Sequence, residues 1–207
     1  MESAPQIAVI ICSARKPRVC PQIAEFVIQT VVSHSPAVKD QLHIIDLAER
    51  QLPFFDEPGI PSQIGDYTEY AHEHTRQWSL EVQNYQGFIF ILPQYNWGYP
   101  AVLKNAIDFL FKEWNKKAAM IVSYGGHGGT KAAEQLRQVL NGVAMHVIET
   151  MPSLTFGSKE ITRTAMAGQK MPPMGGEGGL WESKQDEILA AFNELNAHIH
   201  KRDSKEG

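Results

Sequence analysis

Cysteine is scarce in this chain: Cys12 and Cys20 are the only two among 207 residues. Two cysteines are too few for the disulfide framework of a small secreted domain. They do not form a C-x-x-C pair, so the sequence carries no zinc or redox dithiol motif of that kind. We expect both side chains to be reduced thiols.

Long apolar runs are also missing. The two clearest, Ile7–Cys12 and Phe88–Leu92, are far shorter than the roughly 20 residues with which a helix crosses a bilayer. The N-terminal sequence MESAPQ lacks the basic residues that begin a secretory signal. These absences predict a soluble protein of the cytoplasm.

No charge of one sign dominates the composition. The chain has 19 Lys and Arg against 23 Asp and Glu, which gives a net charge of -4. This balance argues against a general affinity for nucleic acid or for an anionic membrane. With 43% hydrophobic and 20% charged residues, the composition is that of an ordinary globular protein, and the length predicts one domain over 1–207.

Several catalytic signatures are absent. The sequence has no H-E-x-x-H or G-x-S-x-G, the marks of metalloproteases and α/β-hydrolases. It also lacks the G-x-G-x-x-G fingerprint and the P-loop G-x-x-x-x-G-K-[ST], which argues against those two nucleotide-binding classes. The histidine pairs 72/74 and 198/200 are spaced i, i+2 and diverge on a helix, so we interpret them as surface residues.

The chain does contain a regular alternation of short apolar segments and segments with helical spacing. Such alternation implies right-handed βαβ crossovers and a parallel sheet with helices on both faces. We therefore predict a doubly wound α/β fold of the flavodoxin-like type, with five strands in the order 2-1-3-4-5. The predicted strands are 6–12, 42–46, 87–92, 119–123 and 145–149, and the predicted helices begin near Pro21, span 67–85, follow Pro100, include 132–140 and begin again near Trp181.

One interval does not fit this alternation. Residues 157–180 are rich in glycine, proline and methionine, which suit adaptable contacts and poorly suit helix or strand. A loop of this length inside a compact domain is usually a lid, an interface arm or a mobile segment. We expect it to be a mobile loop that shields a ligand site of its own or of a partner subunit, and we expect the tail 201–207 to be frayed.

Three polar motifs each follow a predicted strand. They are CSARKPRVCPQ after the first strand, PQYNWGYP after the third and SYGGHGG after the fourth. In the order 2-1-3-4-5 these strands are neighbours, and ligands of such sheets bind outside the carboxyl ends where the strand order reverses. We therefore predict that the three motifs form one site.

The first motif has the chemistry of a phosphate site. Ser13, Arg15 and Arg18 precede a helix that begins near Pro21, and the backbone N–H groups of residues 19–22 lie at the positive end of its dipole. Taken alone, this loop is better described as a solvated basic turn that caps a helix. Its neighbours in the fold favour the phosphate interpretation.

The second motif gives the most specific signal. Proline stops strand pairing at Pro93, and the following Tyr95, Asn96 and Trp97 offer stacking faces and an amide. The run PQYNWGYPAVLKNAID resembles the P-x-Y-N-x-x-x-P-x-x-L-K-N-x-x-D signature of the NAD(P)H-dependent FMN reductases. The resemblance implies that these three residues border the isoalloxazine ring and that Lys104 and Asn105 fix the following helix.

The other two motifs resemble the same family. The first is similar to its G-S-x-R phosphate loop, with Cys12 in place of the glycine, and the third to its S-Y-G-G loop from Ser123 onward. Glycines at 125 and 126 allow backbone N–H groups to approach a ligand edge, such as the flavin N1 and C2 carbonyl. His127 is a possible further contact to the flavin or acceptor, or a polar loop residue.

The resemblance implies an FMN-dependent enzyme that passes hydride from NADPH or NADH, through FMN, to a quinone, an azo compound or a flavin by a ping-pong mechanism. It also implies a homodimer or homotetramer, whose interface Trp97, Tyr99, Phe111 and Trp114 would serve. Two alternatives stay open: a flavodoxin-type electron carrier and a flavin-binding, redox-sensing interaction module. The residues assigned to the cofactor are Ser13, Arg15, Arg18, Val19, Cys20, Pro21, Gln22, Pro93, Gln94, Tyr95, Asn96, Trp97, Ser123, Tyr124, Gly125 and Gly126, with His127 as a possible addition and no metal ligand.

Overall fold

A computed structural model describes the backbone of residues 4–206 and the side chains of residues 4–201. Its centre is a parallel sheet with the strand order β2-β1-β3-β4-β5, which confirms the predicted flavodoxin-like order. A sixth strand, β6, also pairs with β4. The strands are β1 Ile7–Ile11, β2 Leu42–Asp46, β3 Gly87–Pro93, β4 Ala118–Gly125, β5 His146–Val147 and β6 Ser153–Thr155.

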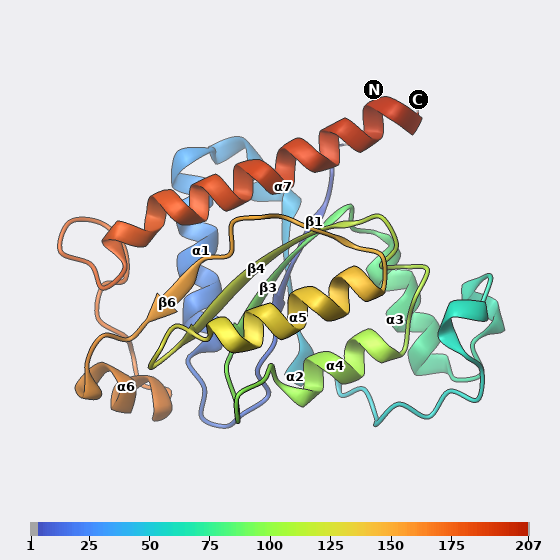
Figure 1. The fold of residues 1–207 in the computed structure, drawn as a ribbon, viewed down its shortest axis with the longest axis horizontal. Helices are drawn as coiled ribbons and strands as arrows, with labels where there is room; N and C mark the ends of the chain where they lie inside the picture. Colours follow the sequence, from blue (N-terminus) through green and yellow to red (C-terminus); the bar gives the residue numbers. More distant parts are fainter. Residues whose placement is uncertain (1–3, 207) are drawn as a thin grey trace.

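Helices cover both faces of the sheet, as predicted (Figure 1). The α-helices are α1 Cys20–His34, α2 Leu47–Arg50, α3 Glu73–Gln83, α4 Ala101–Asp108, α5 Thr130–Gly142, α6 Lys159–Met166 and α7 Gln185–Glu206. Short 3-10 turns occur at Pro36–Gln41, Pro61–Gln63, Tyr67–Glu69 and Glu182–Lys184. No helix within the described residues is both long enough and apolar enough to span a membrane.

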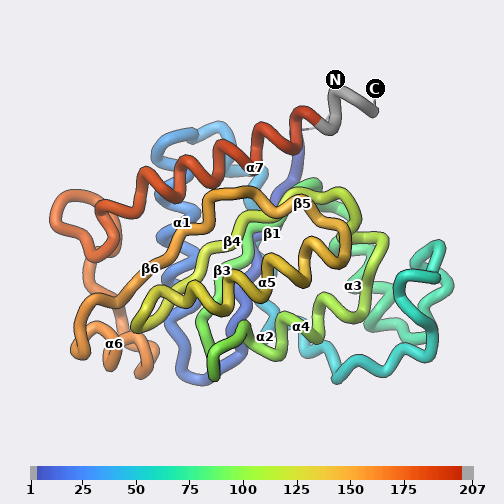
Figure 2. Tube along the Cα trace, in the orientation of Figure 1, coloured from blue at the N-terminus to red at the C-terminus, as the bar shows by residue number. Residues whose placement is uncertain are grey.

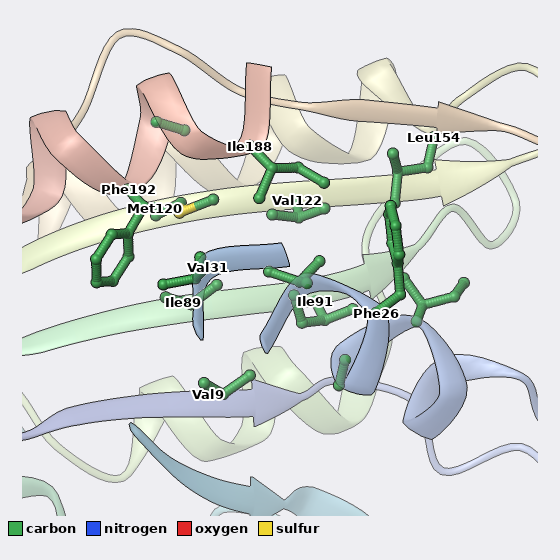
Figure 3. Packing of buried hydrophobic residues seen from close by; sticks show 14 of the residues in the cluster. Val9, Phe26, Val31, Ile89, Ile91, Met120, Val122, Leu154, Ile188 and Phe192 are labelled. Carbon is green, nitrogen blue, oxygen red and sulfur yellow. The ribbon is translucent and has the colours of Figure 1, made fainter. Parts of the chain in front are cut away.

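The core has two halves because successive strand residues point to opposite faces. On one face Val9, Ile89 and Met120 pack against α1 and α7, and Figure 3 shows this cluster between the sheet and those helices. On the other face Ile10 and Phe90 pack against α3, α4 and α5. With both faces covered, β1 and β3 are apolar throughout, which is the pattern that identified them in the sequence.

The fifth strand is shorter than the predicted 145–149. β5 pairs with the beginning of β4, and β6 pairs with its end, so two short strands share one edge position. The backbone N–H groups of Glu149 and Thr150 donate to the Glu194 carboxylate of α7, at 3.0 and 3.1 Å, instead of to a strand. Capture of this backbone by a distant side chain is not visible in the local sequence.

The predicted helix 67–85 begins only at Glu73. The Glu57 carboxylate accepts hydrogen bonds from the N–H groups of Ala71 and His72, at 2.9 and 3.0 Å. These contacts hold the backbone outside the helix until His72. The buried side chains predicted further along, Trp78 and Val82, lie where their spacing placed them.

The prediction of irregular structure throughout 157–180 is wrong in its first third. Helix α6 occupies Lys159–Met166, and the side chain of Ser158 caps it by accepting from the Ile161 N–H at 3.1 Å. Residues 167–181, which carry most of the glycines and prolines, contain no helix or strand. Figure 2 shows this stretch leaving α6, forming a loop at one end of the molecule and entering α7.

The C-terminal segment also differs from expectation. Helix α7 continues to Glu206, so residues 201–206 of the expected frayed tail have helical backbone. Gly207, the end of that prediction, lies outside the described residues. The helix ends with a polar run, which hid its continuation from an analysis of apolar spacing.

Candidate functional site

The three motifs meet at the carboxyl edge of the sheet, as predicted. The strand register aligns Ile11 with Ile91 and Pro93 with Tyr124, so the loops after β1, β3 and β4 begin at the same level. They border a cavity of about 360 Å³, a volume within the usual range for small-molecule sites. Its lining residues are Arg15, Arg18, Val19, Pro93, Gln94, Tyr95, Tyr124, Gly125, Gly126, Phe156, Thr162, Ala165 and Met166.

Some predicted site residues do not line this cavity. Ser13, Cys20 and Ser123 are buried, with 0 to 1% of each residue exposed. Pro21 and Gln22 instead border a second hollow between α1 and residues 170–176. Asn96, Trp97 and His127 are also absent from the lining, with Trp97 67% exposed and His127 exposed on its loop.

Sequence analysis missed one wall of the cavity. Phe156 and the α6 residues Thr162, Ala165 and Met166 close the side opposite the sheet edge. The three α6 residues are spaced i, i+3, i+4, so they share a helix face. The signal that could have found this wall is Ser158, a preferred N-cap residue placed before a helical spacing.

The first loop presents two arginines in different surroundings. Arg15 is exposed, and its Nη2 donates to the Met166 carbonyl at the end of α6 over 2.8 Å. Arg18 is engaged in an ion pair with Asp46, whose hydrogen bonds raise the pKa of the guanidinium further. Arg15 is therefore the more exposed of the two arginines that line the cavity, and Arg18 is the one paired with a carboxylate.

The helix that follows this loop begins without a cap. Helix α1 has no side-chain hydrogen bond at its N-cap, Val19, and no acidic residue in its first turn. Its first N–H groups and the positive end of its dipole therefore face the loop with no side chain satisfying them. Pro21 at the start removes one donor that would otherwise need a partner. This arrangement favours an anion.

The second loop is a tight turn between Tyr95 and Gly98. The two residues exchange backbone hydrogen bonds of 2.9 and 3.0 Å, and the central Asn96 and Trp97 have φ of 45° and 75°. Two successive positive φ angles are typical of a type I′ turn, and they are costly for a side chain as large as Trp. Strain of this kind concentrates at functional sites.

A hydroxyl contact joins the first loop to the second. The Tyr95 hydroxyl and Ser13 Oγ lie 2.7 Å apart, beneath the cavity. Ser13 therefore supports the floor of the site in this structure, and Tyr95 alone of the pair lines the cavity. The predicted convergence of the two motifs is a direct contact.

The third loop turns back on itself and leaves open space at Gly126. Ser123 Oγ donates to the Gly128 carbonyl at 2.7 Å, and Gly129, with φ of 78°, passes so close to Tyr124 that a Cβ would lie 2.9 Å from its carbonyl oxygen. At Gly126 a Cβ would meet no atom within 4 Å. The backbone of residues 125–126 is thus accessible to a ligand from the cavity.

Both thiols lie under the site and are free, as expected. Burial raises the pKa of Cys12 well above its usual value and that of Cys20 to about 11. Burial also raises the pKa of the neighbouring Tyr124 hydroxyl. These groups stay protonated at neutral pH, so they form a neutral floor and are not nucleophiles.

Comparison with known proteins now identifies the family. The family model of NADPH-dependent FMN reductase matches residues 5–158. The chain belongs to this family. The predicted resemblance is thereby confirmed, together with an oxidoreductase that depends on FMN and NAD(P)H.

Several curated relatives agree with this assignment. The chain is 46% identical over 147 residues to the NAD(P)H-dependent FMN reductase LOT6 of Saccharomyces cerevisiae, covering 69% of this chain and 77% of that protein. It is 43% identical over 159 residues to the NAD(P)H-dependent FMN reductase C4B3.06c of Schizosaccharomyces pombe, covering 77% of each. A 2-hydroxy-1,4-benzoquinone reductase of a Burkholderia species is 32% identical over 93 residues, 42% of this chain and 51% of that protein.

A solved structure shares the fold. FerB, a flavoenzyme NAD(P)H:(acceptor) oxidoreductase of Paracoccus denitrificans, is similar with a TM-score of 0.64 and 20% identity, over 96% of this chain and 98% of that one. This likeness confirms the flavodoxin-like architecture.

Proposed function

We propose that this chain binds FMN in the 360 Å³ cavity and passes hydride from NAD(P)H to a small-molecule acceptor. The observation that carries the proposal is the meeting of three loops at one cavity, with Arg15 and the uncapped end of α1 on one side and the open backbone of residues 125–126 on the other. Family membership supports the reaction class, and the geometry of the three loops supports the proposed place.

The residues present fit a flavin mononucleotide. Arg15 and the N-terminal N–H groups of α1 suit its phosphate, since charge-assisted hydrogen bonds and the helix dipole both favour a dianion. Tyr95 and Tyr124 line the cavity, and the accessible backbone at Gly125 and Gly126 suits the polar edge of a flat heterocycle. Met166 closes the outer side.

The flavin, when bound, supplies hydride acceptance and donation, so no side-chain acid or base is required. The chain's own residues bind, orient and exclude water. Tyr124 and the two thiols beneath the cavity are neutral, and they add no charge to the floor.

The acceptor we propose is a quinone, an azo compound or a flavin. The similarity to a benzoquinone reductase supports the quinone, and the convergence of the three motifs on one cavity supports one shared position for donor and acceptor. Such sharing predicts ping-pong kinetics. Parallel double-reciprocal lines with NADPH and a quinone are expected, and intersecting lines would contradict one shared position.

We also propose that the protein is a cytoplasmic homodimer or homotetramer. Trp97, strained and 67% exposed beside the cavity, supports an interface there, and Tyr99 and Phe111 are half-buried. The prediction that Trp114 serves the interface is wrong, because Trp114 is 1% exposed and its indole N–H donates to the Ile107 carbonyl within the core. Sedimentation velocity tests the assembly, and Trp97→Ala is expected to weaken it.

A further inference from the structure

Arg18 was predicted to bind the cofactor, but its surroundings differ from those of a phosphate ligand. Its side chain is 18% exposed and forms a two-pronged ion pair with Asp46, which is 10% exposed. Nη1 donates to Oδ1 at 2.7 Å, and Nη2 donates to Oδ2 at 2.5 Å. The positive charge of Arg18 is thus already matched by a carboxylate.

Asp46 is held in place by the fold. It is the last residue of β2, paired in register with Ile11 of β1, and its Oδ1 also accepts from the Ala48 N–H at 3.0 Å to cap α2. A carboxylate fixed by a strand and a helix is a rigid anchor. It lies next to the strand from which the phosphate loop departs.

Arg18 connects this anchor to the loop. The same Nη1 that meets Asp46 also donates to the backbone carbonyl of Ser13, five residues earlier. The guanidinium therefore closes the loop on itself across residues 13–18. Ser13 Oγ is in turn within 2.7 Å of the Tyr95 hydroxyl of the second motif.

We infer that the Arg18–Asp46 pair is a brace that sets the shape of the phosphate loop, and that Asp46 is a positioning residue for FMN binding. The inference rests on the proposed function, since it concerns the same cavity. It assigns the phosphate to Arg15 and the backbone, and it assigns Arg18 to the loop.

The inference makes a prediction of opposite sign to a simple charge argument. Asp46 is a negative charge near a site for a dianion, and it occupies an arginine. By charge alone, Asp46→Asn would strengthen FMN binding, because it removes repulsion and frees Arg18. A brace predicts weaker binding, because the loop loses its fixed geometry and pre-organisation is lost.

The experiment measures FMN and riboflavin affinity of the flavin-free protein by fluorescence titration. Asp46→Asn and Arg18→Lys are compared with Glu81→Gln, which breaks the matched surface ion pair between Arg50 and Glu81 outside the cavity. We expect Asp46→Asn and Arg18→Lys each to weaken FMN binding about tenfold, equal to about 1.4 kcal/mol, and Glu81→Gln to leave it unchanged. Lysine keeps the charge but cannot form the two-pronged contact.

Two further readouts separate a brace from general damage. Riboflavin, which lacks the phosphate, is expected to bind all variants alike, and Asp46→Glu is expected to restore part of the FMN affinity. The double variant Asp46→Asn/Arg18→Lys is expected to lose no more than either single one, because both break one unit.

The outcomes distinguish the two claims. If the unmodified protein does not bind FMN, the proposed function fails and the brace falls with it. If the unmodified protein binds FMN and Asp46→Asn binds it equally or more tightly, the brace alone is overturned. Equal losses of FMN and riboflavin affinity would also overturn the brace. If Asp46→Asn does not fold, Arg18→Lys decides: a loss of FMN affinity without a loss of riboflavin affinity supports the brace, and equal losses overturn it.

Discussion

Helix α1 adjoins two hollows that differ in size and in what surrounds them. The larger, about 870 Å³, lies between the outer face of α1 and residues 170–176, and its walls include Glu25, Phe26 and Met171. The smaller, about 360 Å³, lies at the carboxyl edge of the sheet and is bordered by loops after three different strands. Size alone would select the larger hollow as the ligand site, whereas the meeting of three polar loops selects the smaller one.

One polar side chain of the larger hollow, Gln22, is hydrogen-bonded to the opposite wall. The Gln22 amide donates to the Gln169 carbonyl at 2.9 Å and accepts from the Met171 N–H at 2.9 Å. It ties the irregular segment to α1, which explains why the prediction of Gln22 at the cofactor site is not matched by the cavity lining. The larger hollow is thus a product of packing between a helix and an irregular segment.

The largest expected difference between the two hollows is in the loss of FMN affinity when a basic residue is removed from each, and it is expected at Arg15. A charge-assisted hydrogen bond contributes about 1.5 to 3 kcal/mol, so Arg15→Ala is expected to weaken FMN binding by roughly ten- to more than a hundredfold. Lys170→Ala, at the larger hollow, is the matched removal of a cation and is expected to change nothing. Riboflavin should bind all three proteins almost equally. If Arg15→Ala purifies with FMN bound at full affinity, the phosphate lies elsewhere.

A smaller effect is expected from filling the cavity. Gly126 and Gly142 both have open space at their Cβ positions, but only Gly126 lines the cavity. Gly126→Val is expected to weaken FMN and riboflavin alike by about tenfold, since it occupies the ligand's volume and not its phosphate contact. Gly142→Val is the control and should bind both normally. Retained binding in Gly126→Val would place the flavin ring outside this cavity.

The floor of the smaller cavity predicts a dependence of stability on pH. Burial raises the pKa of Cys20 from 9.0 to about 11, so the unfolded thiol loses its proton before the folded one does. The contribution of this thiol to stability is therefore fully present below pH 9, and it is lost as the pH rises through about 11. Urea unfolding of Cys20→Ala should show a flatter decline in that window. Cys12 and Tyr124, whose pKa values burial also raises, contribute to the remaining slope. An unchanged slope would mean that Cys20 is accessible to water.

The smallest expected effect is in the irregular segment. In the flavin-free protein, amides in 167–179 are expected to exchange faster than those of α1, because much of this segment is held by side-chain contacts and not by a helix or strand. FMN should slow exchange in α6, which walls the smaller cavity, more than in 170–176. Hydrogen exchange read by mass spectrometry measures both. Uniformly slow exchange without flavin would contradict the mobile-lid prediction.

Periodicity and strand-end motifs were sufficient to predict the framework. β1 and β3 are buried apolar segments with clear boundaries. The strand order agrees with right-handed βαβ crossovers. Arg15, Tyr95 and Gly126 were found because each stands directly after such a strand. Local rules determine these features, so a local analysis recovers them.

The parts that were missed depend on contacts between distant residues. The Glu57 carboxylate binds backbone before α3, and the Glu194 carboxylate binds backbone after β5. Asp46 pairs with Arg18, and each of these contacts joins residues 14 or more positions apart in the chain. Helix α6 was hidden by the glycines and prolines that follow it, although Ser158 marks its start. A side chain that captures another segment's backbone leaves no periodic trace in the sequence.

The central claim is that FMN held at Arg15 passes hydride from NADPH to an acceptor. Its most direct test is to mix the FMN-loaded protein anaerobically with NADPH and then with a quinone, while the visible absorption spectrum is recorded. We expect the flavin absorption to bleach on NADPH addition and to return on addition of the quinone. We expect both changes to be much smaller in Arg15→Ala at an FMN concentration just sufficient to saturate the unmodified protein. A flavin absorption that persists after NADPH, or bleaching that is unaffected in Arg15→Ala, would contradict the account.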